Sequence, residues 1–567
     1  MEEEKHYDGI LRGHLAGNFN LERVERARLA TEAERSMKFG AVLRKYWKAA
    51  AWSVVLSTAL VMEGFDVIII NSFWGNPAFL ERFGQRDGDG HLYIPANWQA
   101  AINNAALIGE IVGLGMTGIL QNRYGSRPTY LIGMFIMAVT IFAPVFATSL
   151  EILFAGEILM GLAWGMFQTL TTAYAAEICP IALRAYLASY VNMCWGIGLT
   201  LGAGVVRGTL NIEGQWSWRL PYALQWIWPL PLFVAVCFAP EGESMYIPNP
   251  LLSYVCSTGP WWLVKNGKIE EARRSLWRLA AEGSWTDEGL DDYIALIEYT
   301  NELEREEVAG SGFADCFRKS NRRRTEIACM VWTIQYSCGQ PIVNYTTQFL
   351  QTAGMNADQA FDINLGNNAM IVFGTLVTWV TMIYIGRRPL YIAGCAGMAI
   401  VLGITGIMGC IKQTTNVTWA IGVLLLLLTL VFACTVGPAC YTIVAELPSS
   451  RVRQQTIILA RGCYLVAGVI VQQLNPRMLG VADWNWGAKA GFFYLGTNAL
   501  GCAYCYFRLP ETKGRTFGEL DVLFSNNVSA RKFRSTPVSA FEDTTAVQHS
   551  IVDQKAEETR IELAVGV

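Results

Sequence analysis

Charged residues are scarce in this chain of 567 residues, because Asp, Glu, Lys and Arg together make up 16% of it, whereas soluble domains carry about 25%. This shortage excludes an ordinary soluble protein. The chain also lacks an excess of basic residues, since its formal net charge is -3. Binding to phosphates needs a basic surface, so nucleic acid is not expected as a partner. A nucleotide-binding loop and a nucleophile–base pattern are missing too, and we do not expect an enzyme.

Clustered metal ligands are lacking as well. The 14 cysteines are scattered through apolar stretches, and Cys502 and Cys505 form a C-x2-C pair inside a hydrophobic segment without a second pair. Such a pair is weak evidence for a metal or redox site. Small apolar side chains packed between helices explain these cysteines better. We therefore expect no metal and no cofactor. The first 40 residues lack the apolar core of a cleavable signal peptide.

Long hydrophobic runs make up most of the remaining sequence. Hydrophobic residues account for 52% of the chain, with 19 Trp, and a run of roughly 20 apolar residues is long enough to cross a bilayer as a helix. The sequence predicts an all-α membrane protein with twelve transmembrane helices in two sets of six. The expected spans are 49–71, 98–119, 128–147, 151–175, 187–207, 220–239, 326–349, 364–385, 389–411, 417–440, 455–475 and 487–507.

Polar stretches divide the chain into five expected parts. These are a cytoplasmic N-terminal tail, a six-helix bundle, a cytoplasmic loop with short helices, a second six-helix bundle and a cytoplasmic tail, at residues 1–46, 47–239, 240–324, 325–509 and 510–567. Basic residues mark the cytoplasmic side of a membrane protein, and the central loop carries the run Arg322, Arg323, Arg324. Both termini are therefore expected in the cytoplasm. The tails, 1–40 and about 522–567, read as disordered.

The first span contains two acids, Glu63 and Asp66. A charged side chain in the hydrocarbon is costly unless it faces a wet cavity or a partner, so such an acid indicates a functional site. A spacing of three residues puts both acids on one face of the helix. Protonation of one acid relieves both its burial and the repulsion between the two. The pair is therefore expected to take up and release a proton.

Two corresponding turns suggest that the chain is a duplicated six-span unit. GILQNRYGSRP follows the second span at 118–128, and IYIGRRP follows the eighth at 383–389. PE at 240–241, the WLVxxGxxEEA pattern at 262–272 and PETKG at 510–514 complete a set that covers nearly all of 45–520. With these motifs, the chain resembles the sugar porters of the major facilitator superfamily.

A narrower resemblance rests on four longer segments, at 48–66, 156–195, 437–461 and 509–521. They are similar to the fungal maltose permeases, which are alpha-glucoside:proton symporters. The resemblance implies a major facilitator fold and import of an alpha-glucoside such as maltose with a proton, by alternating access. It also implies a multi-pass monomer in the lipid bilayer of the plasma membrane. A carrier of other sugars, either monosaccharides or other disaccharides, coupled or uncoupled, and a sugar sensor remain alternatives.

The charge balance of the spans departs from that of general sugar porters. In many of them a span-1 acid pairs with an Arg at the start of span 4, where this chain has Glu157. The one basic residue well inside a C-terminal span is Arg461, which stays charged. We expect Glu63, Asp66 and Glu110 to form the protonation cluster, with Arg461 lowering its affinity for protons in one conformation. Alternatively, Arg461 is a structural partner and Glu157 reaches the membrane interface.

Sugar binding requires amides, hydroxyls and aromatic platforms near the midplane of the membrane. The resemblance places substrate-contacting glutamines and an aromatic residue in span 7, where Gly339 and Pro341 also weaken the helix, as a moving gate requires. The alternatives are hydrogen bonds between helices and a kink without a gating role. The expected substrate-binding residues are Gln335, Gln340, Asn344, Tyr345, Gln225, Trp226, Gln168 and Asn368.

Charged residues in the cytoplasmic turns suggest a conformational latch. Arginines there can hold carbonyls or acids at the ends of neighbouring spans, and the resemblance implies acidic partners that include Glu511. Simple anchoring of arginines on the cytoplasmic side explains them equally well. The expected latch residues are Arg123, Arg127, Glu177, Arg184, Arg387, Arg388, Glu446 and Arg451. Residues 245–259 interrupt a stretch that runs without a break in the family, and they are either a genuine insertion or a retained intron.

Overall fold

The structure of the chain is a computed structural model. It describes residues 26, 39–86, 92–124, 126–178, 181–237, 263–264, 267–281, 285–308, 313–352, 354–412, 414–449, 452–480, 483–515, 520, 523–524 and 526–536. The segment 245–259, with its possible intron, lies outside these residues.

The first half of the chain is helical apart from one short hairpin, in which Gln85–Arg86 (β1) pairs antiparallel with Leu92–Tyr93 (β2). Thr58 interrupts the first span, and its hydroxyl donates to the carbonyl of Val55 at 2.5 Å, a bond that bends helices. The helices are α3 (Phe39–Lys45), α4 (Trp47–Ser57), α5 (Ala59–Phe73), α6 (Pro77–Phe83), α7 (Ala96–Tyr124), α8 (Ser126–Thr140), α9 (Phe142–Val145), α10 (Leu150–Ile178), α11 (Ile181–Thr209), α12 (Trp216–Leu224), η1 (Gln225–Ile227) and α13 (Pro229–Cys237).

Two helices of the central loop, α16 (Ile269–Leu279) and α17 (Asp287–Val308), precede the second set of spans. The break expected in span 7 is confirmed, because α18 ends at Ser337 and Gly339 has a φ of 101°, which Gly adopts without steric penalty. The remaining helices are η2 (Phe313–Phe317), α18 (Lys319–Ser337), α19 (Gln340–Val343), α20 (Thr346–Thr352), α21 (Ala357–Tyr384), α22 (Arg387–Met408), α23 (Thr415–Cys434), α24 (Val436–Glu446), α25 (Arg453–Leu479), η4 (Gly487–Lys489), α26 (Ala490–Arg508) and η5 (Ala530–Lys532).

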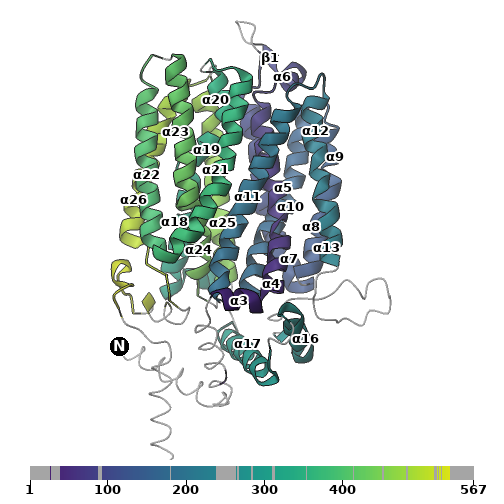
Figure 1. The fold of residues 1–567 in the computed structure, drawn as a ribbon, viewed down its shortest axis with the longest axis vertical. Helices are drawn as coiled ribbons and strands as arrows, with labels where there is room; N and C mark the ends of the chain where they lie inside the picture. The colour runs from purple at the N-terminus through teal and green to yellow at the C-terminus, as the bar shows by residue number, and fades with distance from the viewer. Residues whose placement is uncertain are drawn as a thin grey trace, which may run out of the picture.

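The expected all-α membrane fold is confirmed. Ten helical segments of the described chain are long and apolar enough to cross a membrane. The other two expected spans correspond to α18–α20, which is broken at Gly339, and to α26. The two sets of helices stand side by side in Figure 1, the first in purple and blue and the second in green and yellow. They meet where α11 packs along α21 and α7 packs along α25.

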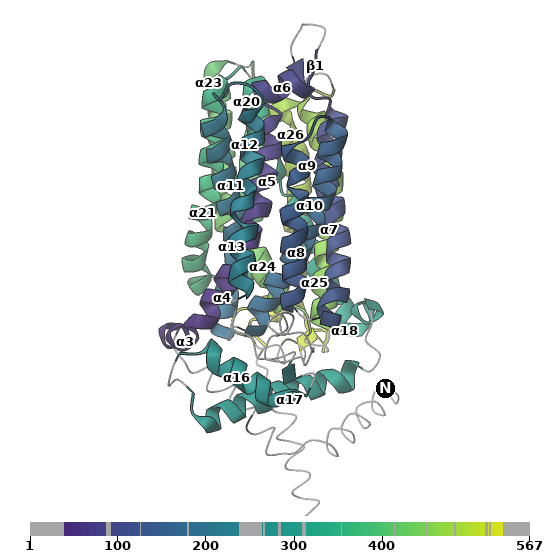
Figure 2. The same cartoon turned by 90° about the vertical axis from the view of Figure 1, so that its right-hand side faces the viewer.

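One end of the bundle carries α3, α16 and α17, and the opposite end carries α6 and the hairpin (Figures 1 and 2). We call these the α17 end and the α6 end. The backbone N–H of Ala281, just after α16, donates to the carbonyl of Lys45 in α3 at 2.8 Å. The ammonium group of Lys45 lies 3.8 Å from the ring centroid of Trp285. These contacts fix the central loop to the start of the first span.

Part of the C-terminal tail that was expected to be disordered is ordered. Phe524 and Phe533 are buried and stack edge to face, with ring centroids 5.0 Å apart. The guanidinium of Arg324 lies 4.5 Å from the Phe524 ring, and Arg323 donates to the carbonyl of Val528 at 2.8 Å. The expectation was wrong here because it weighed the polar residues of the tail and overlooked aromatic rings that cover two arginines of α18.

Glycines allow α7 and α10 to pack in close contact. A Cβ at Gly113 would collide with the carbonyl of Leu162 in α10, and one at Gly165 would collide with the carbonyl of Glu110 in α7. Small residues at such crossings let helix backbones approach each other in membranes. This contact fixes the height of Glu110 relative to α10.

We expect Gly113→Val to destabilise the protein, because overpacking a tight contact costs about 1–3 kcal/mol. Gly115→Val, in the same helix, is the matched control, since a Cβ there meets nothing within 4 Å. Thermal unfolding of the purified protein in detergent should show a lower Tm for the first variant and an unchanged Tm for the second. Equal Tm values would contradict the close contact.

Candidate functional site

A central cavity lies between the two halves of the protein. Its lining comes from α5, α7, α10 and α11 of the first half and from α18, α19, α23, α24 and α25 of the second, and it includes the acids Glu63, Asp66, Glu110 and Glu157. A smaller pocket shares Glu63 and Arg461 and extends past Leu60 and Thr169, toward the α17 end.

Glu63, Glu110 and Arg461 form an ion cluster across the two halves, which we call the Arg461 trio. A terminal nitrogen (Nη2) of Arg461 in α25 lies 3.4 Å from Oε2 of Glu110 in α7 and 3.8 Å from Oε1 of Glu63 in α5. All three side chains are buried. The amide of Gln168 in α10 donates to Glu63 at 2.5 Å. With two carboxylates and one guanidinium, the trio has a formal charge of -1, so its attraction across the interface depends on protonation.

Aromatic rings surround the guanidinium of Arg461. It lies 4.1 Å from the ring centroid of Tyr464 and 5.0 Å from that of Trp332, distances at which a cation is attracted to the ring face. The sequence interpretation missed Tyr464 as a functional residue, although its spacing of three from Arg461 puts both on one face of α25. In the described part of the chain, Nε and Nη1 of Arg461 have no hydrogen-bond partner.

Asp66 lies apart from the Arg461 trio. Its Oδ1 accepts a hydrogen bond from the side-chain amide of Gln225 in η1, and its other polar neighbour is Glu157 of α10. Glu157 has an exposed fraction of 0%. The alternative in which Glu157 reaches the membrane interface is therefore wrong, because this side chain is packed inside the first bundle. The residues expected to form one protonation cluster are therefore divided. Glu63, Glu110 and Arg461 lie together, and Asp66 lies apart from them.

Amide side chains of the broken span 7 line the central cavity. They are Gln335, Gln340 and Asn344. The amide nitrogen of Gln335 donates to the carbonyl of Gly437 at 3.2 Å. The side-chain oxygens of Gln335 and Gln340 are buried and have no partner among the described residues. The break at Gly339 therefore places two amides whose oxygens are available to a polar ligand.

The other residues expected to bind substrate occupy different places. Gln168 lines the smaller pocket, and Gln225 binds Asp66. Trp226 donates to the carbonyl of Ala138 at 3.0 Å and packs on Phe142. Asn368 donates to the carbonyl of Asn364, one turn earlier in α21, at 2.7 Å.

Tyr345 takes part in a hydrogen-bond chain between the two halves. Its hydroxyl accepts from the amide of Asn103 in α7 at 2.7 Å and donates to the amide oxygen of Gln472 in α25 at 2.9 Å. Asn103 also donates to Asn71 in α5 at 3.2 Å. Nothing in the sequence distinguishes Asn103 or Gln472, because polar residues in spans commonly form hydrogen bonds between helices. This chain lies between the cavity and the α6 end.

Further contacts join the halves at the α6 end. Arg207, at the end of α11, forms ion pairs of 2.8 Å with both Asp358 and Asp362 at the start of α21. The amide of Gln351 donates to the carbonyl of Gly75 at 3.4 Å. Together with the Tyr345 chain, these bonds join the two halves at the α6 end.

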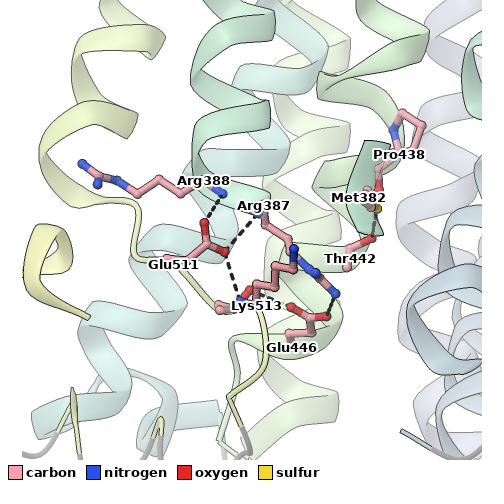
Figure 3. Close-up of polar contacts among 9 residues, drawn as sticks. Met382, Arg387, Arg388, Pro438, Thr442, Glu446, Glu511 and Lys513 are labelled. Atoms are coloured by element: carbon pink, nitrogen blue, oxygen red, sulfur yellow. Dashed lines mark hydrogen bonds and ion pairs between the residues drawn. The ribbon is translucent and has the colours of Figure 1, made fainter. Parts of the chain in front are cut away.

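A second charged cluster lies at the α17 end of the C-terminal bundle (Figure 3). The carboxylate of Glu511 accepts hydrogen bonds from the backbone N–H groups of Arg387 and Arg388, at 3.0 and 3.3 Å. The side chain of Arg387 forms an ion pair of 2.9 Å with Glu446, which also accepts from Thr512 at 2.6 Å. We call Glu511, Arg387, Arg388 and Glu446 the Glu511 latch. The latch joins three places: the start of α22, the end of α24 and the segment that follows α26.

The remaining residues expected in the latch are distributed differently. Arg127 is buried and donates to the carbonyl of Cys237 at the end of α13. Arg123 is exposed and lies 5.5 Å from the ring of its neighbour Tyr124. The side chains of Glu177 and Arg184, and all of Arg451, lie outside the part of the chain that the structure describes.

Comparison with known proteins gives consistent matches. Residues 52–524 match the family described as sugar (and other) transporters. The chain is 39% identical over 525 residues to maltose permease MAL31 of Saccharomyces cerevisiae, which covers 92% of this chain and 83% of that protein. It is also 39% identical over 529 residues to the general alpha-glucoside permease of that yeast, which covers 93% and 83%.

Solved structures match in fold. The major facilitator superfamily proton:xylose symporter XylE bound to 6-bromo-6-deoxy-D-glucose has a TM-score of 0.68 at 20% identity, and the match covers 84% of this chain and 99% of that one. The inward open conformation of XylE from E. coli has a TM-score of 0.62 at 19% identity, with the same coverage. The expected major facilitator fold is confirmed by these matches.

Proposed function

We propose, from the premise that the chain belongs to the sugar transporter family of the major facilitator superfamily, that it imports an alpha-glucoside such as maltose together with a proton. Sugar transport follows from the family, and the fold is that of a transporter and not of an enzyme. The alpha-glucoside is proposed because relatives that match over most of the chain are named maltose and general alpha-glucoside permeases.

The observation that carries proton coupling is the Arg461 trio. Its acids belong to the first half and its arginine to the second, so the ion pairs hold the two halves together beside the cavity. A proton on Glu63 or Glu110 removes one negative charge and weakens this attraction, which allows the halves to rearrange. When Arg461, which stays charged, again approaches the protonated acid, it favours release of the proton, because a nearby cation stabilises the charged carboxylate.

The sugar is assigned to the central cavity beside the trio. A sugar is neutral and must exchange its hydrogen bonds to water for bonds to polar side chains. The unpartnered oxygens of Gln335 and Gln340, with Asn344 next to them, supply acceptors in one wall. The free nitrogens of Arg461 supply donors nearby. Sugar and proton thus act on the same guanidinium, which couples their binding.

For the orientation, we propose that the α17 end faces the cytoplasm and the α6 end faces outward across the plasma membrane. The bonds of Tyr345 and Arg207 then close the outer side of the cavity. We further propose a monomer in the lipid bilayer. Its two six-helix bundles, residues 47–239 and 325–509, are joined by the loop 240–324 and flanked by the tails 1–46 and 510–567. Basic residues at the α17 end, such as Arg322 and Arg323, support this orientation.

Uptake of labelled sugars into cells that lack their own sugar transporters tests this function. We expect maltose to enter against its gradient and the external medium to become alkaline as it does so. A pH difference of about one unit supplies about 1.4 kcal/mol per proton, enough for roughly tenfold accumulation. The same uptake and pH measurements are made with labelled glucose, trehalose and sucrose. Entry of maltose without alkalinisation would contradict coupling, and entry of glucose alone would contradict the alpha-glucoside.

A further inference from the structure

We propose that Asp66 and Glu157 form a second proton site, a carboxyl pair that shares one proton in this conformation and exchanges it through the central cavity. The proposal rests on the function proposed above and deepens it, since it places a coupled proton on a pair distinct from the Arg461 trio. The two carboxyl groups come from α5 and α10 and both line the cavity.

The burial of the pair is complete. Asp66 is 1% exposed, Glu157 is 0% exposed, and the neighbouring Tyr222 of α12 is also 0% exposed. The polar groups within interaction range of Glu157 are Asp66 and Tyr222. Among the described residues, neither oxygen of Glu157 has a hydrogen-bond partner, and the Tyr222 hydroxyl also lacks one. Three polar atoms are thus buried at one point without the hydrogen bonds that such atoms require.

Cations do not compensate the pair. In the described part of the chain, neither Asp66 nor Glu157 forms an ion pair, and Arg461 is engaged with Glu63 and Glu110. Two neighbouring carboxylates that are buried without a cation cannot both remain charged, because desolvation and mutual repulsion both oppose it. A proton is the simplest ligand that satisfies them.

The hydrogen bonds indicate which acid holds the proton. Gln225 donates its side-chain N–H to Asp66, which suits a charged acceptor. Glu157 is then the acid that carries the proton, and its O–H donates to Asp66, so one bond satisfies both side chains. The Tyr222 hydroxyl is placed to donate to the second oxygen of Glu157. The charge of the pair becomes -1 instead of -2.

The charged and titratable groups around the pair come from each neighbouring helix. Tyr222 faces it from α12, and Glu63 lies three residues before Asp66 on α5. Glu110 of α7 and Arg461 of α25 face each other instead. The pair therefore responds to pH through its own proton and not through loss of an ion pair. A proton reaches it from the cavity, and leaves when the cavity opens to the cytoplasm.

The test uses the full-length protein in liposomes with a pH-sensitive dye and labelled maltose. We expect Glu157→Gln to lower the number of protons carried per sugar and to flatten the dependence of uptake on external pH, because the amide donates permanently to Asp66. Exchange of maltose across the membrane without net proton movement should persist. Asp66→Asn combined with Glu157→Gln should lower the number of protons per sugar no further, since the pair shares one proton.

Controls separate this inference from the function on which it rests. Glu151→Gln, on the exposed first turn of α10, should keep the wild-type proton-to-sugar ratio. Tyr222→Phe keeps the packing and should shift the dependence of uptake on pH. It tests the second proton site if Glu157→Gln does not fold. An unchanged ratio and pH profile in the variants that fold, or uptake that follows Na⁺ instead of pH, would overturn the second proton site. Failure of the wild-type protein to move maltose or protons would instead overturn the proposed function.

Discussion

Replacing Arg461 with Gln is expected to abolish the accumulation of maltose. The change leaves the buried carboxylates of Glu63 and Glu110 without the guanidinium that lies 3.4–3.8 Å from them. Breaking a buried ion pair by removing one partner costs about 3–5 kcal/mol, which corresponds to roughly a hundredfold or more in an equilibrium. Steady-state accumulation of labelled maltose in intact cells, corrected for the amount of protein in the membrane, measures the effect.

The double variant Arg461→Gln with Glu110→Gln separates stability from coupling. It restores the formal charge of the trio to -1, because only Glu63 then remains charged. We expect the Tm to recover toward the wild-type value, while accumulation stays absent because no cation can displace the proton. Arg461→Lys keeps the charge but loses the planar group that stacks on Tyr464, and should be intermediate. Accumulation by Arg461→Gln at the wild-type level would show that the trio is not part of coupling.

Glu511→Ala is expected to have the second largest effect, on the Glu511 latch. The carboxylate accepts backbone hydrogen bonds from Arg387, Arg388 and Lys513 at 3.0–3.3 Å. A hydrogen bond to a charged group contributes about 1.5–3 kcal/mol, so loss of all three lowers stability by roughly 4.5 kcal/mol or more. Gly386 leaves room for this carboxylate, because a Cβ there would collide with it. The Tm in a thermal unfolding experiment and the initial rate of maltose uptake should both decrease.

Glu511→Gln is the matched control for the latch. It keeps the length of the side chain and one acceptor oxygen, and should lose only part of the stability. Lys412→Ala, an exposed position after α22, should leave the Tm unchanged. If Glu511→Ala had the Tm of the wild type, the latch would be an incidental contact at the end of α22.

The fold was predictable because most spans are long apolar runs and because Gly and Pro mark the break in span 7. Helix ends were less predictable. The run at 187–207 belongs to α11, which extends over 181–209. The helix is longer than the apolar run because the residues that flank the run are also helical. The ordered part of the C-terminal tail was missed, as its stability comes from Phe524 and Phe533 packing on distant arginines, a contact that local composition does not reveal.

The candidate site was predictable in its residue types but not in its grouping. The acids of the first half and Arg461 stand out because ionisable residues are rare in spans. The spacing of Glu63 and Asp66 puts them on one helical face, yet Glu63 points to Arg461 and Gln168 while Asp66 points to Gln225. Which neighbour each acid meets depends on how α5 packs against α10 and η1. A single sequence does not encode that choice visibly.

The charge of the Arg461 trio has a consequence for cells with a voltage across their membrane. Two carboxylates and one guanidinium give the trio one negative charge in the empty carrier, and the sugar adds none. A voltage of about 100 mV does about 2.3 kcal/mol of work on one charge that crosses the whole field. With the cell interior negative, this work on the trio favours the outward-facing form of the empty carrier, and a proton on the trio removes that contribution when the sugar is carried inward. The membrane voltage therefore helps the empty transporter return to its outward-facing form after each release of sugar into the cell.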